Sequence, residues 1–196
     1  MPSDKLKRYR AKRDFRKTRE PEGAKRGAKH EPIFVIQKHR ASTLHYDFRL
    51  EVDGVLKSWA VPKGPSTDPR EKRLAVEVED HPLDYADFEG GIGEGNYGAG
   101  AVIVWDTGPY TSEEPMEEAL ERGHVIVDLH GHKLHGGYLL QRTRKVGGQQ
   151  QWLLIKRRGE GADARRNPVS TEPASVRSGR TVEEVAAEVS DNARHP

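Results

Sequence analysis

Hydrophobic and polar residues alternate strictly along one stretch of the chain, from residue 44 to residue 52. The even positions are leucine, tyrosine, phenylalanine, leucine and valine. The odd positions are ionisable: His45, Asp47, Arg49 and Glu51. A period of two is typical of a β-strand with one face on the hydrophobic core. Since the even residues account for that face, the strand carries a row of ionisable groups on the other.

Short apolar runs separated by turn residues continue from residue 33 to about residue 158. They predict eight strands, at 33–39, 43–52, 55–61, 73–79, 101–106, 124–131, 133–144 and 151–158. Asp53 and Gly54 separate the second strand from the third, and this pair favours a tight type I′ hairpin turn. With one convincing helix, at 115–123, the pattern predicts an all-β fold. We expect a single barrel-like or sandwich domain of about eight antiparallel strands with one or two short helices.

Both ends of the chain differ from this strand-rich region. We expect a basic N-terminal arm (1–30), the β-domain (31–158) and a polar, flexible C-terminal tail (159–196). Within the tail, residues 181–189 have the pattern of a short amphipathic helix. Residues 80–100 are rich in glycine, and we expect a long irregular loop there, of the kind that often carries function.

The composition is polar, with 34% hydrophobic residues, 33% charged residues and a mean hydropathy of -0.86. Cysteine is absent, which excludes disulfides and thiolate metal ligands. No window approaches the roughly 18 apolar residues of a membrane span, and no apolar run at the N-terminus resembles a secretory signal. We therefore expect a cytoplasmic protein that has no membrane partner.

Charge is distributed unevenly along the chain. The net charge is +2, yet residues 1–30 contain twelve Lys or Arg residues and only four Asp or Glu residues. A basic arm on a nearly neutral body fits a protein that binds a phosphate backbone. It also fits a solvated, disordered tail, and the charge alone does not decide between the two.

The ionisable row offers a candidate metal site. His45, Asp47 and Arg49 project from one side of the predicted strand at intervals of about 7 Å. His39 ends the preceding strand and reaches the same place if the two strands are neighbours. Two imidazoles and a carboxylate form a facial ligand set that suits Mn²⁺, Zn²⁺ or Fe²⁺, and the planar guanidinium of Arg49 matches phosphate oxygens. The spacing also fits an exposed polar face on which Asp47 merely pairs with Arg49.

Three residues in loops add to this chemistry. His81 precedes a proline, which favours extended backbone at the histidine. Its imidazole and the hydroxyl of Tyr85 are groups that donate to phosphate or act as general acids. Lys63 lies in a proline-rich loop, where its charge could meet a phosphate. His81 also fits an ordinary turn residue, and Lys63 an ordinary solvated lysine.

Two other patterns favour structural interpretations. The glycines of 93–100 precede a strand rather than open a helix, so the dinucleotide-binding fingerprint does not apply and a flexible loop that exposes its backbone is expected. His130, His132 and His135 straddle a predicted turn, which fits an adventitious histidine cluster.

Several long blocks of sequence point to one family. They are FVIQKH, LHYDFRLEVDGVLKSWAVPKGPS, KRLAVEVEDHPLDYADFEG and GEGNYGAGAVIVWD, preceded by YRAKRDFRKTREP. Together they closely resemble the phosphoesterase domain of bacterial ligase D, over most of residues 5–157. The resemblance implies a barrel-like domain, a nucleoid-associated monomer and a Mn²⁺-dependent activity in non-homologous end joining. Its substrates would be DNA or mixed RNA/DNA 3′ ends in a primer-template duplex, trimmed by 3′-ribonuclease and 3′-phosphatase steps to a 3′-OH.

The same resemblance implies a role for each candidate residue. The metal ligands would be His39, His45 and Asp47. The phosphate would be bound by Arg49 and His81, with help from Lys63 and Arg73, and Tyr85 would complete the catalytic set. The supporting residues would be Gln37, Arg13, Asp14 and Glu20. Since three of these belong to the arm, we expect the arm to fold back toward the site.

The chain departs from ligase D in lacking regions that fit a polymerase or a ligase. We therefore expect a stand-alone form that works with a separate DNA ligase and polymerase, and residues 160–196 have no evident counterpart. Two other functions stay open. A non-catalytic DNA-end-binding module would bind in a salt-sensitive way and would ignore Mn²⁺. A metal-dependent enzyme acting on small phosphorylated metabolites would leave the basic arm without a use.

Overall fold

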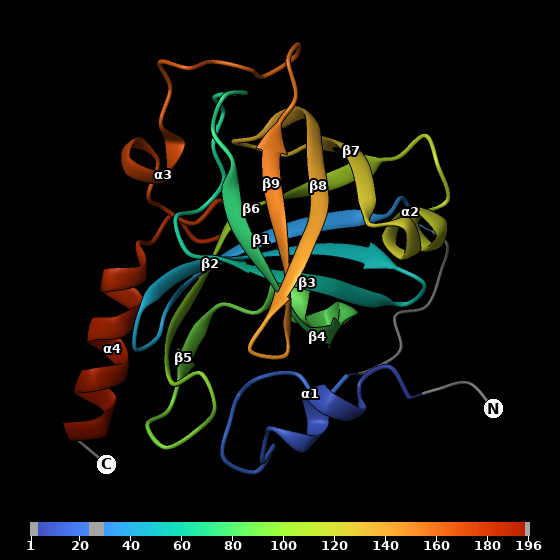
Figure 1. Ribbon diagram of the computed structural model, residues 1–196. Coiled ribbons are helices and arrows are strands. Elements are labelled where there is room, and N and C mark those ends of the chain that lie inside the picture. Colours follow the sequence, from blue (N-terminus) through green and yellow to red (C-terminus); the bar gives the residue numbers. More distant parts are fainter. Residues whose placement is uncertain (1–3, 24–29, 195–196) are drawn as a thin grey trace.

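The computed structural model describes residues 4–23 and 30–194 of the chain (Figure 1). Its helices and strands, in chain order, are α1 (Lys7–Ala11), β1 (Ile33–Arg40), β2 (Leu44–Val52), β3 (Val55–Val61), β4 (Arg73–Pro82), the 3₁₀ helix η1 (Leu83–Asp87), β5 (Gly90–Ile92), β6 (Gly100–Thr111), α2 (Met116–Arg122), β7 (His124–His130), β8 (His135–Val146), β9 (Gln149–Lys156), α3 (Pro168–Thr171) and α4 (Val182–Arg194). Two parts of the predicted arm, residues 1–3 and 24–29, lie outside the described residues.

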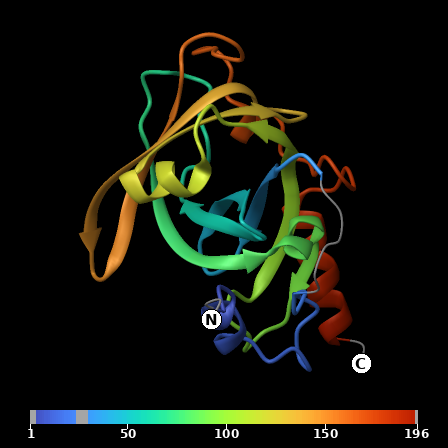
Figure 2. The same ribbon diagram turned by 90° about the vertical axis from the view of Figure 1, so that its right-hand side faces the viewer.

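The strands form a closed antiparallel barrel (Figures 1 and 2). Among the described residues the strand order is β1-β2-β3-β4-β9-β8-β7-β6, and a pairing between β1 and β6 closes the ring of eight. The additional strand β5 pairs with β6. The predicted all-β, barrel-like fold is confirmed, and closure of the ring leaves these eight strands without a free edge.

The β2–β3 hairpin is built as its sequence predicts. Val52 pairs with Val55, so Asp53 and Gly54 form a two-residue turn. Their φ angles are 48° and 80°, and a type I′ turn requires positive values at both positions. The turn fixes the register of the hairpin, because a slip by one residue would exchange the two faces of β2.

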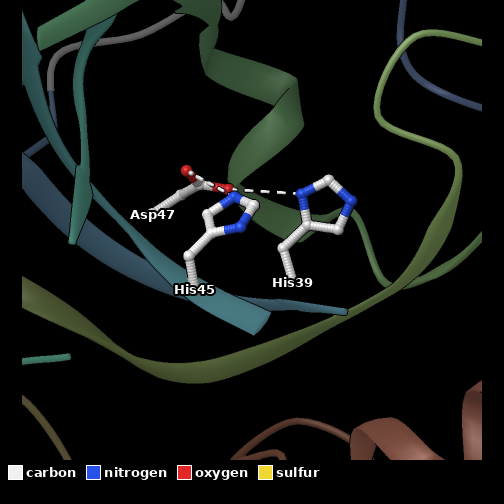
Figure 3. A group of neighbouring side chains, drawn as sticks. All are labelled: His39, His45 and Asp47. Atoms are coloured by element: carbon white, nitrogen blue, oxygen red, sulfur yellow. Dashed lines mark ion pairs between the residues drawn. The ribbon is translucent and has the colours of Figure 1, made fainter. Parts of the chain in front are cut away.

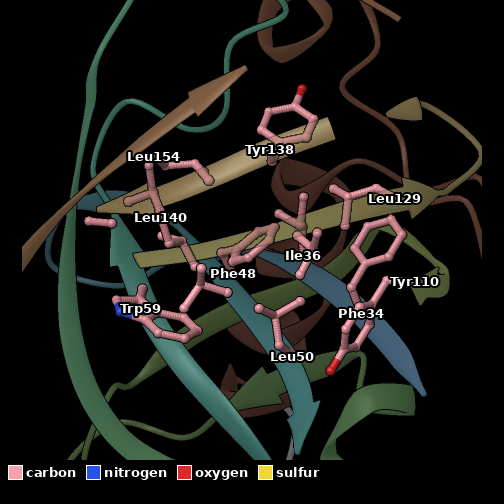
Figure 4. Close-up of a cluster of buried hydrophobic side chains, with 14 of the residues drawn as sticks. Phe34, Ile36, Phe48, Leu50, Trp59, Tyr110, Leu129, Tyr138, Leu140 and Leu154 are labelled. Atoms are coloured by element: carbon pink, nitrogen blue, oxygen red, sulfur yellow. The ribbon is translucent and has the colours of Figure 1, made fainter. Parts of the chain in front are cut away.

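The main hydrophobic core fills the barrel interior (Figure 4). Tyr46, Phe48 and Leu50 of β2 point into it beside Trp59 of β3, as the alternation predicts. Leu44 is the exception, because it lies at the end of its strand and is 45% exposed. The predicted apolar face therefore begins at Tyr46 and not at Leu44.

A second hydrophobic core lies apart from this one and joins the arm to the sheet. Tyr9 of α1 and Tyr85 of η1 pack there with Val35 and Leu56, the barrel residues whose side chains alternate with those of the interior. The outer face of the sheet is therefore covered by the arm and by η1. This cover explains why both faces of β2 are buried near its middle.

The region between residues 80 and 100 is more regular than predicted. β4 continues through Pro82, η1 follows at once, and β5 begins at Gly90. Only residues 88–89 and 93–99 lie outside helices and strands, so the prediction of one long irregular loop was wrong. Pro82 ends the strand and supplies the extended backbone, with φ of -68° and ψ of 152°, from which η1 starts.

The C-terminal segment, predicted as a polar and flexible tail, packs against the barrel in its described part. Val182 and Val185 of α4 are buried against Ala101 and Ile103 of β6. Upstream of α4, the buried amine of Lys133 donates hydrogen bonds to backbone oxygens in the segment 172–174. Within the described residues no helix combines the length and apolar character needed to cross a bilayer.

Candidate active site

Two histidines and one aspartate meet where β1 and β2 lie side by side (Figure 3). His39 and His45 are paired across the two strands, and Asp47 follows His45 by two residues on the same face. One candidate ligand atom from each side chain lies within 4.8 Å of the others. The expectation that His39 reaches the spot through a neighbouring strand is confirmed.

The hydrogen bonds of the two imidazoles point their free nitrogens at the same carboxylate. His39 Nε2 lies 2.6 Å from the carbonyl oxygen of Gly98, and His45 Nδ1 lies 3.2 Å from that of Thr43. A carbonyl oxygen only accepts, so these nitrogens carry the hydrogens. The other nitrogens, His39 Nδ1 and His45 Nε2, lie 3.7 and 3.4 Å from the oxygens of Asp47.

This arrangement fits a divalent cation. In neutral histidines the inward nitrogens carry lone pairs, which would face the negative oxygens of Asp47 with nothing between them. A cation at that position resolves the repulsion, and histidines that bind metals usually donate their other N–H to a backbone carbonyl or a carboxylate. His39, His45 and Asp47 thus offer a donor set that could hold a transition metal.

Asp47 is held in its charged form. Burial alone would raise its pKa, but the positive charge of Arg49, together with hydrogen bonds from the histidines when their inward nitrogens are protonated, holds the pKa well below its ordinary value. Burial likewise opposes protonation of His45, yet the hydrogen bond and charge of Asp47 raise its pKa above the ordinary value. The charged carboxylate of Asp47 therefore favours a positive charge between the imidazoles, either a proton or a metal ion.

Arg49 lies beside Asp47 and is only 3% exposed. Its Nε donates to Gln37 Oε1 at 2.8 Å and its Nη1 donates to Ser58 Oγ at 2.9 Å. Its Nη2 lies 3.5 Å from Asp47 Oδ2, so the simple pairing of these two residues does occur. An exposed polar face, the alternative that the spacing left open, is excluded by the burial.

Gln37 connects Arg49 to η1. Its side-chain amide donates to the carbonyl oxygens of Tyr85, at 2.8 Å, and Phe88, at 3.0 Å, while its own oxygen accepts from Arg49. The fully buried Gln37 therefore fixes the guanidinium with respect to η1. Its position agrees with the supporting role expected for it.

Two arm residues reach the same cluster. Tyr85 Oη donates to Glu20 Oε2 at 2.8 Å, and Arg13 Nε donates to the same oxygen at 2.9 Å. The guanidinium of Arg13 lies 3.5 Å from His81 Nε2. Burial, followed by the charge of Glu20, raises the pKa of Tyr85 well above its ordinary value, so its hydroxyl keeps its proton. The arm folds back onto the site as expected.

His81 is buried and neutral. Its Nδ1 lies 3.0 Å from the carbonyl oxygen of Glu79 and therefore carries the hydrogen, which leaves a lone pair on Nε2. Burial and the positive charges of Arg49 and Arg13 lower the pKa of His81 well below its ordinary value. The rings of Tyr9 and Tyr85 pack edge-on against the imidazole.

Three predicted residues make their contacts elsewhere. Lys63 has an exposed side chain, and its carbonyl oxygen accepts a hydrogen bond from Arg73 at 3.0 Å. Arg73 also pairs with Glu71 at 2.5 Å. Asp14 bonds to Arg16 and not to the cluster. Roles for Lys63, Arg73 and Asp14 at the site stay predictions.

The histidines of the β7–β8 turn do not form a comparable group. His130 and His135 are paired across the two strands, and both are exposed, as is His132. Within residues 4–23 and 30–194, the group of His39, His45 and Asp47 is the one whose ligand atoms are close enough to hold a metal ion.

Several contacts were missed by reasoning from the sequence. Ser58 is the buried acceptor for Arg49, and Glu79 lies 2.9 Å from Lys12 and 3.7 Å from Arg13. The sequence offered only a weak signal for Glu79, which ends the predicted strand 73–79 two residues before His81. Gly98 orients His39 through its backbone, a role that fits the expectation of a loop exposing its backbone.

The fold and the cluster define a β-barrel protein with a candidate divalent-metal centre next to a buried arginine. The model of one protein family, the DNA Ligase D 3′-phosphoesterase domain, matches residues 37–142. This is more than half of the chain, and the chain belongs to this family. All six residues expected to be catalytic lie within the matched range.

Relatives in three bacteria support the assignment. The chain is 56% identical, over 187 residues, to the multifunctional non-homologous end joining protein LigD of Pseudomonas aeruginosa. It is 51% identical over 142 residues to LigD of Mycobacterium tuberculosis and 48% identical over 151 residues to LigD of Mycolicibacterium smegmatis. These matches cover 93%, 72% and 72% of the chain, but only 22%, 19% and 20% of the relatives. The chain thus spans about a fifth of the length of the curated relatives it matches.

Proposed function

We propose that this protein is a Mn²⁺-dependent phosphoesterase that heals DNA 3′ ends. It would remove a 3′-terminal ribonucleoside and then the remaining 3′-phosphate, leaving a 3′-OH. The observation that carries the proposal is the cluster itself, in which two histidines turn their free nitrogens toward Asp47 beside the buried Arg49. Membership in the 3′-phosphoesterase family supports the choice of substrate.

The metal would be held by His39, His45 and Asp47. When bound, a divalent ion such as Mn²⁺ acts as a Lewis acid that polarises a phosphoryl oxygen and neutralises charge in the transition state. Other divalent transition metals suit the same ligands. The remaining chemistry rests on the neighbouring side chains.

Arg49 would bind the phosphoryl group. Two of its five N–H groups donate to Gln37 and Ser58, which hold the guanidinium in a fixed orientation. The Nη2 end, next to Asp47, keeps N–H groups for the oxygens of the substrate. Because the guanidinium is fixed before the substrate arrives, it stabilises charge on phosphorus without reorganising.

His81 would carry the proton. In the free protein it is neutral, because burial and two arginine charges lower its pKa. A phosphate bound at Arg49 compensates those charges, so His81 takes up a proton at Nε2. When water attacks phosphorus, His81 would deliver this proton to the leaving oxygen, which is the 5′ oxygen of the ribonucleoside in the first step and the 3′ oxygen of the DNA in the phosphatase step. Tyr85 is the second candidate donor, and its hydroxyl is engaged with Glu20 in the free protein.

The relatives, which are named as multifunctional non-homologous end joining proteins, support a biological setting. We infer that the chain acts in double-strand break repair on DNA or mixed RNA/DNA 3′ ends. Its product would serve a DNA ligase and a polymerase, either on separate proteins or on further parts of a longer chain. The roles of Lys63, Arg73 and Asp14 belong to this proposal.

One experiment tests the function directly. The protein is incubated with a primer-template ending in a 3′-phosphate and with another ending in one ribonucleotide, in Mn²⁺, Mg²⁺, Zn²⁺ or chelator. End-specific trimming that needs Mn²⁺ is the expected result. Binding without trimming would favour the non-catalytic DNA-end module. Hydrolysis of small phosphorylated metabolites, but not of DNA ends, would favour the metabolic enzyme.

A further inference from the structure

A groove of about 320 Å³ separates the arm from the β8–β9 hairpin. Arg8, Lys12 and Tyr97 line one side, and Arg142, Lys145 and Gln149 line the other. In Figure 1 the orange turn between β8 and β9 lies next to the blue arm. We refer to this feature as the arm–hairpin groove.

The groove carries an excess of unpaired positive charge. Arg8 and Lys145 are exposed, and neither is paired with an acidic group among the described residues. Four cations line the groove against two acids. Glu79 pairs with Lys12, and Glu77 accepts the indole N–H of Trp152 at 2.7 Å. The groove is therefore suited to bind anions, with one free cation on each wall.

The aromatic ring of Tyr97 lies at the end of the groove nearest the candidate metal ligands. Tyr97 is 50% exposed, and the amine of Lys12 lies 4.6 Å from the centre of its ring. The next residue, Gly98, accepts the hydrogen bond from His39. An exposed ring backed by a cation is the kind of surface on which a nucleobase stacks.

The groove and the candidate metal centre belong to the same sheet. Pairings across the strands run from Asp47 to Ala60, Val76 and then Gln151, next to the groove residues of the hairpin. Followed along the curved sheet, three strand spacings correspond to about 14 Å. At about 3.4 Å per nucleotide, a backbone that follows this path covers it with roughly four nucleotides.

We propose that the arm–hairpin groove binds the phosphate backbone of the nucleic acid, about four nucleotides from the 3′ end held at the metal centre. This proposal rests on the proposed function, because it takes a nucleic-acid 3′ end to be the substrate. Arg8 and Lys145 contact phosphates from opposite walls, and the side chain of Gln149 adds a hydrogen-bond donor. Tyr97 stacks on an unpaired base between the groove and the metal centre.

A regularly charged chain fits the groove better than an acidic peptide does. Arg8 lies on α1 and Lys145 on the hairpin, two elements far apart in the sequence. Both face the arm–hairpin groove, which leads toward the candidate metal centre, where a phosphate ester would react. A substrate with a continuous backbone can fill both places at once. A small phosphorylated molecule bound at the metal centre reaches neither cation.

The test compares two double variants of the full chain. Arg8→Ala/Lys145→Ala removes the two groove cations. Lys72→Ala/Arg158→Ala removes two exposed cations at the opposite end of β9 and serves as the matched control. Binding to a 3′-phosphorylated primer-template is measured at several salt concentrations, with KM and kcat in Mn²⁺. Cleavage of a nucleoside 3′-phosphate is measured in parallel.

The groove variant should bind the duplex about 10-fold more weakly at low salt, and its log–log salt slope should fall by about 2, since each phosphate contact contributes about 0.9. KM for the duplex should rise while kcat and cleavage of the nucleoside 3′-phosphate stay unchanged. The control should match the wild type throughout. Equal slopes in both variants would overturn the groove proposal.

The two proposals fail in different ways. If the wild type hydrolyses no 3′ end but the groove variant still loses duplex affinity, the phosphoesterase function is refuted and the groove stands as a nucleic-acid surface. If the wild type trims 3′ ends and the groove variant binds the duplex normally, the function stands and the groove is refuted. A Tyr97→Leu variant adds a third readout, because loss of stacking should weaken binding to single-stranded ends.

Discussion

The hydroxyl of Tyr85 donates a hydrogen bond to Glu20, a residue 65 positions earlier in the chain, at 2.8 Å. Glu20 is 4% exposed and binds Arg13 through the same oxygen. The arm therefore reaches the residues of the candidate active site through one buried carboxylate. Because Arg13 also lies beside His81, the arm belongs to the site and is more than a cover for it.

Removing that carboxylate should detach the arm. Glu20→Ala leaves the buried guanidinium of Arg13 with only its longer ion pair with Glu79, at 3.7 Å. Breaking a buried ion pair costs about 3–5 kcal/mol. We expect faster cleavage of the arm in limited proteolysis, a lower free energy of unfolding and reduced 3′-end trimming. Glu22→Ala, at an exposed position nearby, is the control. An arm as resistant as that of the wild type would contradict the prediction.

Metal binding should depend on one histidine cluster and not on the other. Mn²⁺ at 100 times its Kd should stabilise the wild type by about 2.7 kcal/mol, visible as a higher Tm. His45→Ala should abolish the shift, whereas His135→Ala, in the exposed turn, should keep it. A shift that survives in His45→Ala but disappears in His135→Ala would move the metal site to the turn.

Gly98 offers a test of how His39 is oriented. A Cβ on Gly98 would lie 3.2 Å from His39 Cε1, and the residue has a φ of +73°. Gly95 has a similar φ, +81°, but a Cβ there meets nothing within 4 Å. Both alanine variants therefore strain the backbone, but only Gly98→Ala should also weaken Mn²⁺ binding. The expected loss of affinity is about 10- to 100-fold, as found when a group that hydrogen-bonds to a metal ligand is changed. Titration calorimetry of the two variants makes the comparison, and equal affinities would count against the orienting role.

The meeting of the three candidate metal ligands could be predicted from local sequence because local rules place them. Strand alternation sets His45 and Asp47 on one face, and the short link between two antiparallel strands brings His39 opposite His45. The hairpin turn at Asp53 and Gly54 follows from the same kind of rule. Each depends on residues a few positions apart, where periodicity and turn chemistry are informative.

The burial of the site could not be predicted in this way. Arg49 is covered because the arm and η1 pack on the outer face of the sheet, through Tyr9 and Tyr85. Ser58 and Glu79 become partners of the site only through the barrel register. Likewise, Val182 and Val185 lie in a segment of polar composition, and only the structure shows that they are buried against β6. These contacts join distant parts of the chain, for which local patterns carry no signal.

Lysine should not replace arginine at position 49. The guanidinium donates hydrogen bonds to Gln37 and Ser58 simultaneously and lies next to Asp47. A lysine amine is a single point charge that lacks the planar set of donors needed to contact all three. Loss of charge-assisted hydrogen bonds worth about 1.5–3 kcal/mol should lower kcat/KM about 10- to 150-fold in Arg49→Lys. Arg158→Lys, on the exposed surface, should behave like the wild type. Wild-type kinetics in Arg49→Lys would remove the arginine from the proposed mechanism.

Alkaline pH should destabilise the barrel through Tyr46. Burial, and secondarily the charge of Glu183, raises the pKa of Tyr46 to about 12, whereas an unfolded tyrosine titrates near pH 10. The folded protein therefore holds more protons between these values. The stabilising contribution of this group is complete below about pH 10 and is lost as the pH rises through about 12, a change of up to about 2.7 kcal/mol.

The variant Tyr46→Phe isolates this contribution, because it keeps the ring that packs against Trp105 in the core and removes the ionisable hydroxyl. Denaturant unfolding at a series of pH values from about 8 to about 12 should show a shallower loss of stability in Tyr46→Phe than in the wild type. The two curves should stay parallel below about pH 9, where no phenol ionises in either state. Curves that stay parallel up to about pH 12 would show that Tyr46 does not carry the effect.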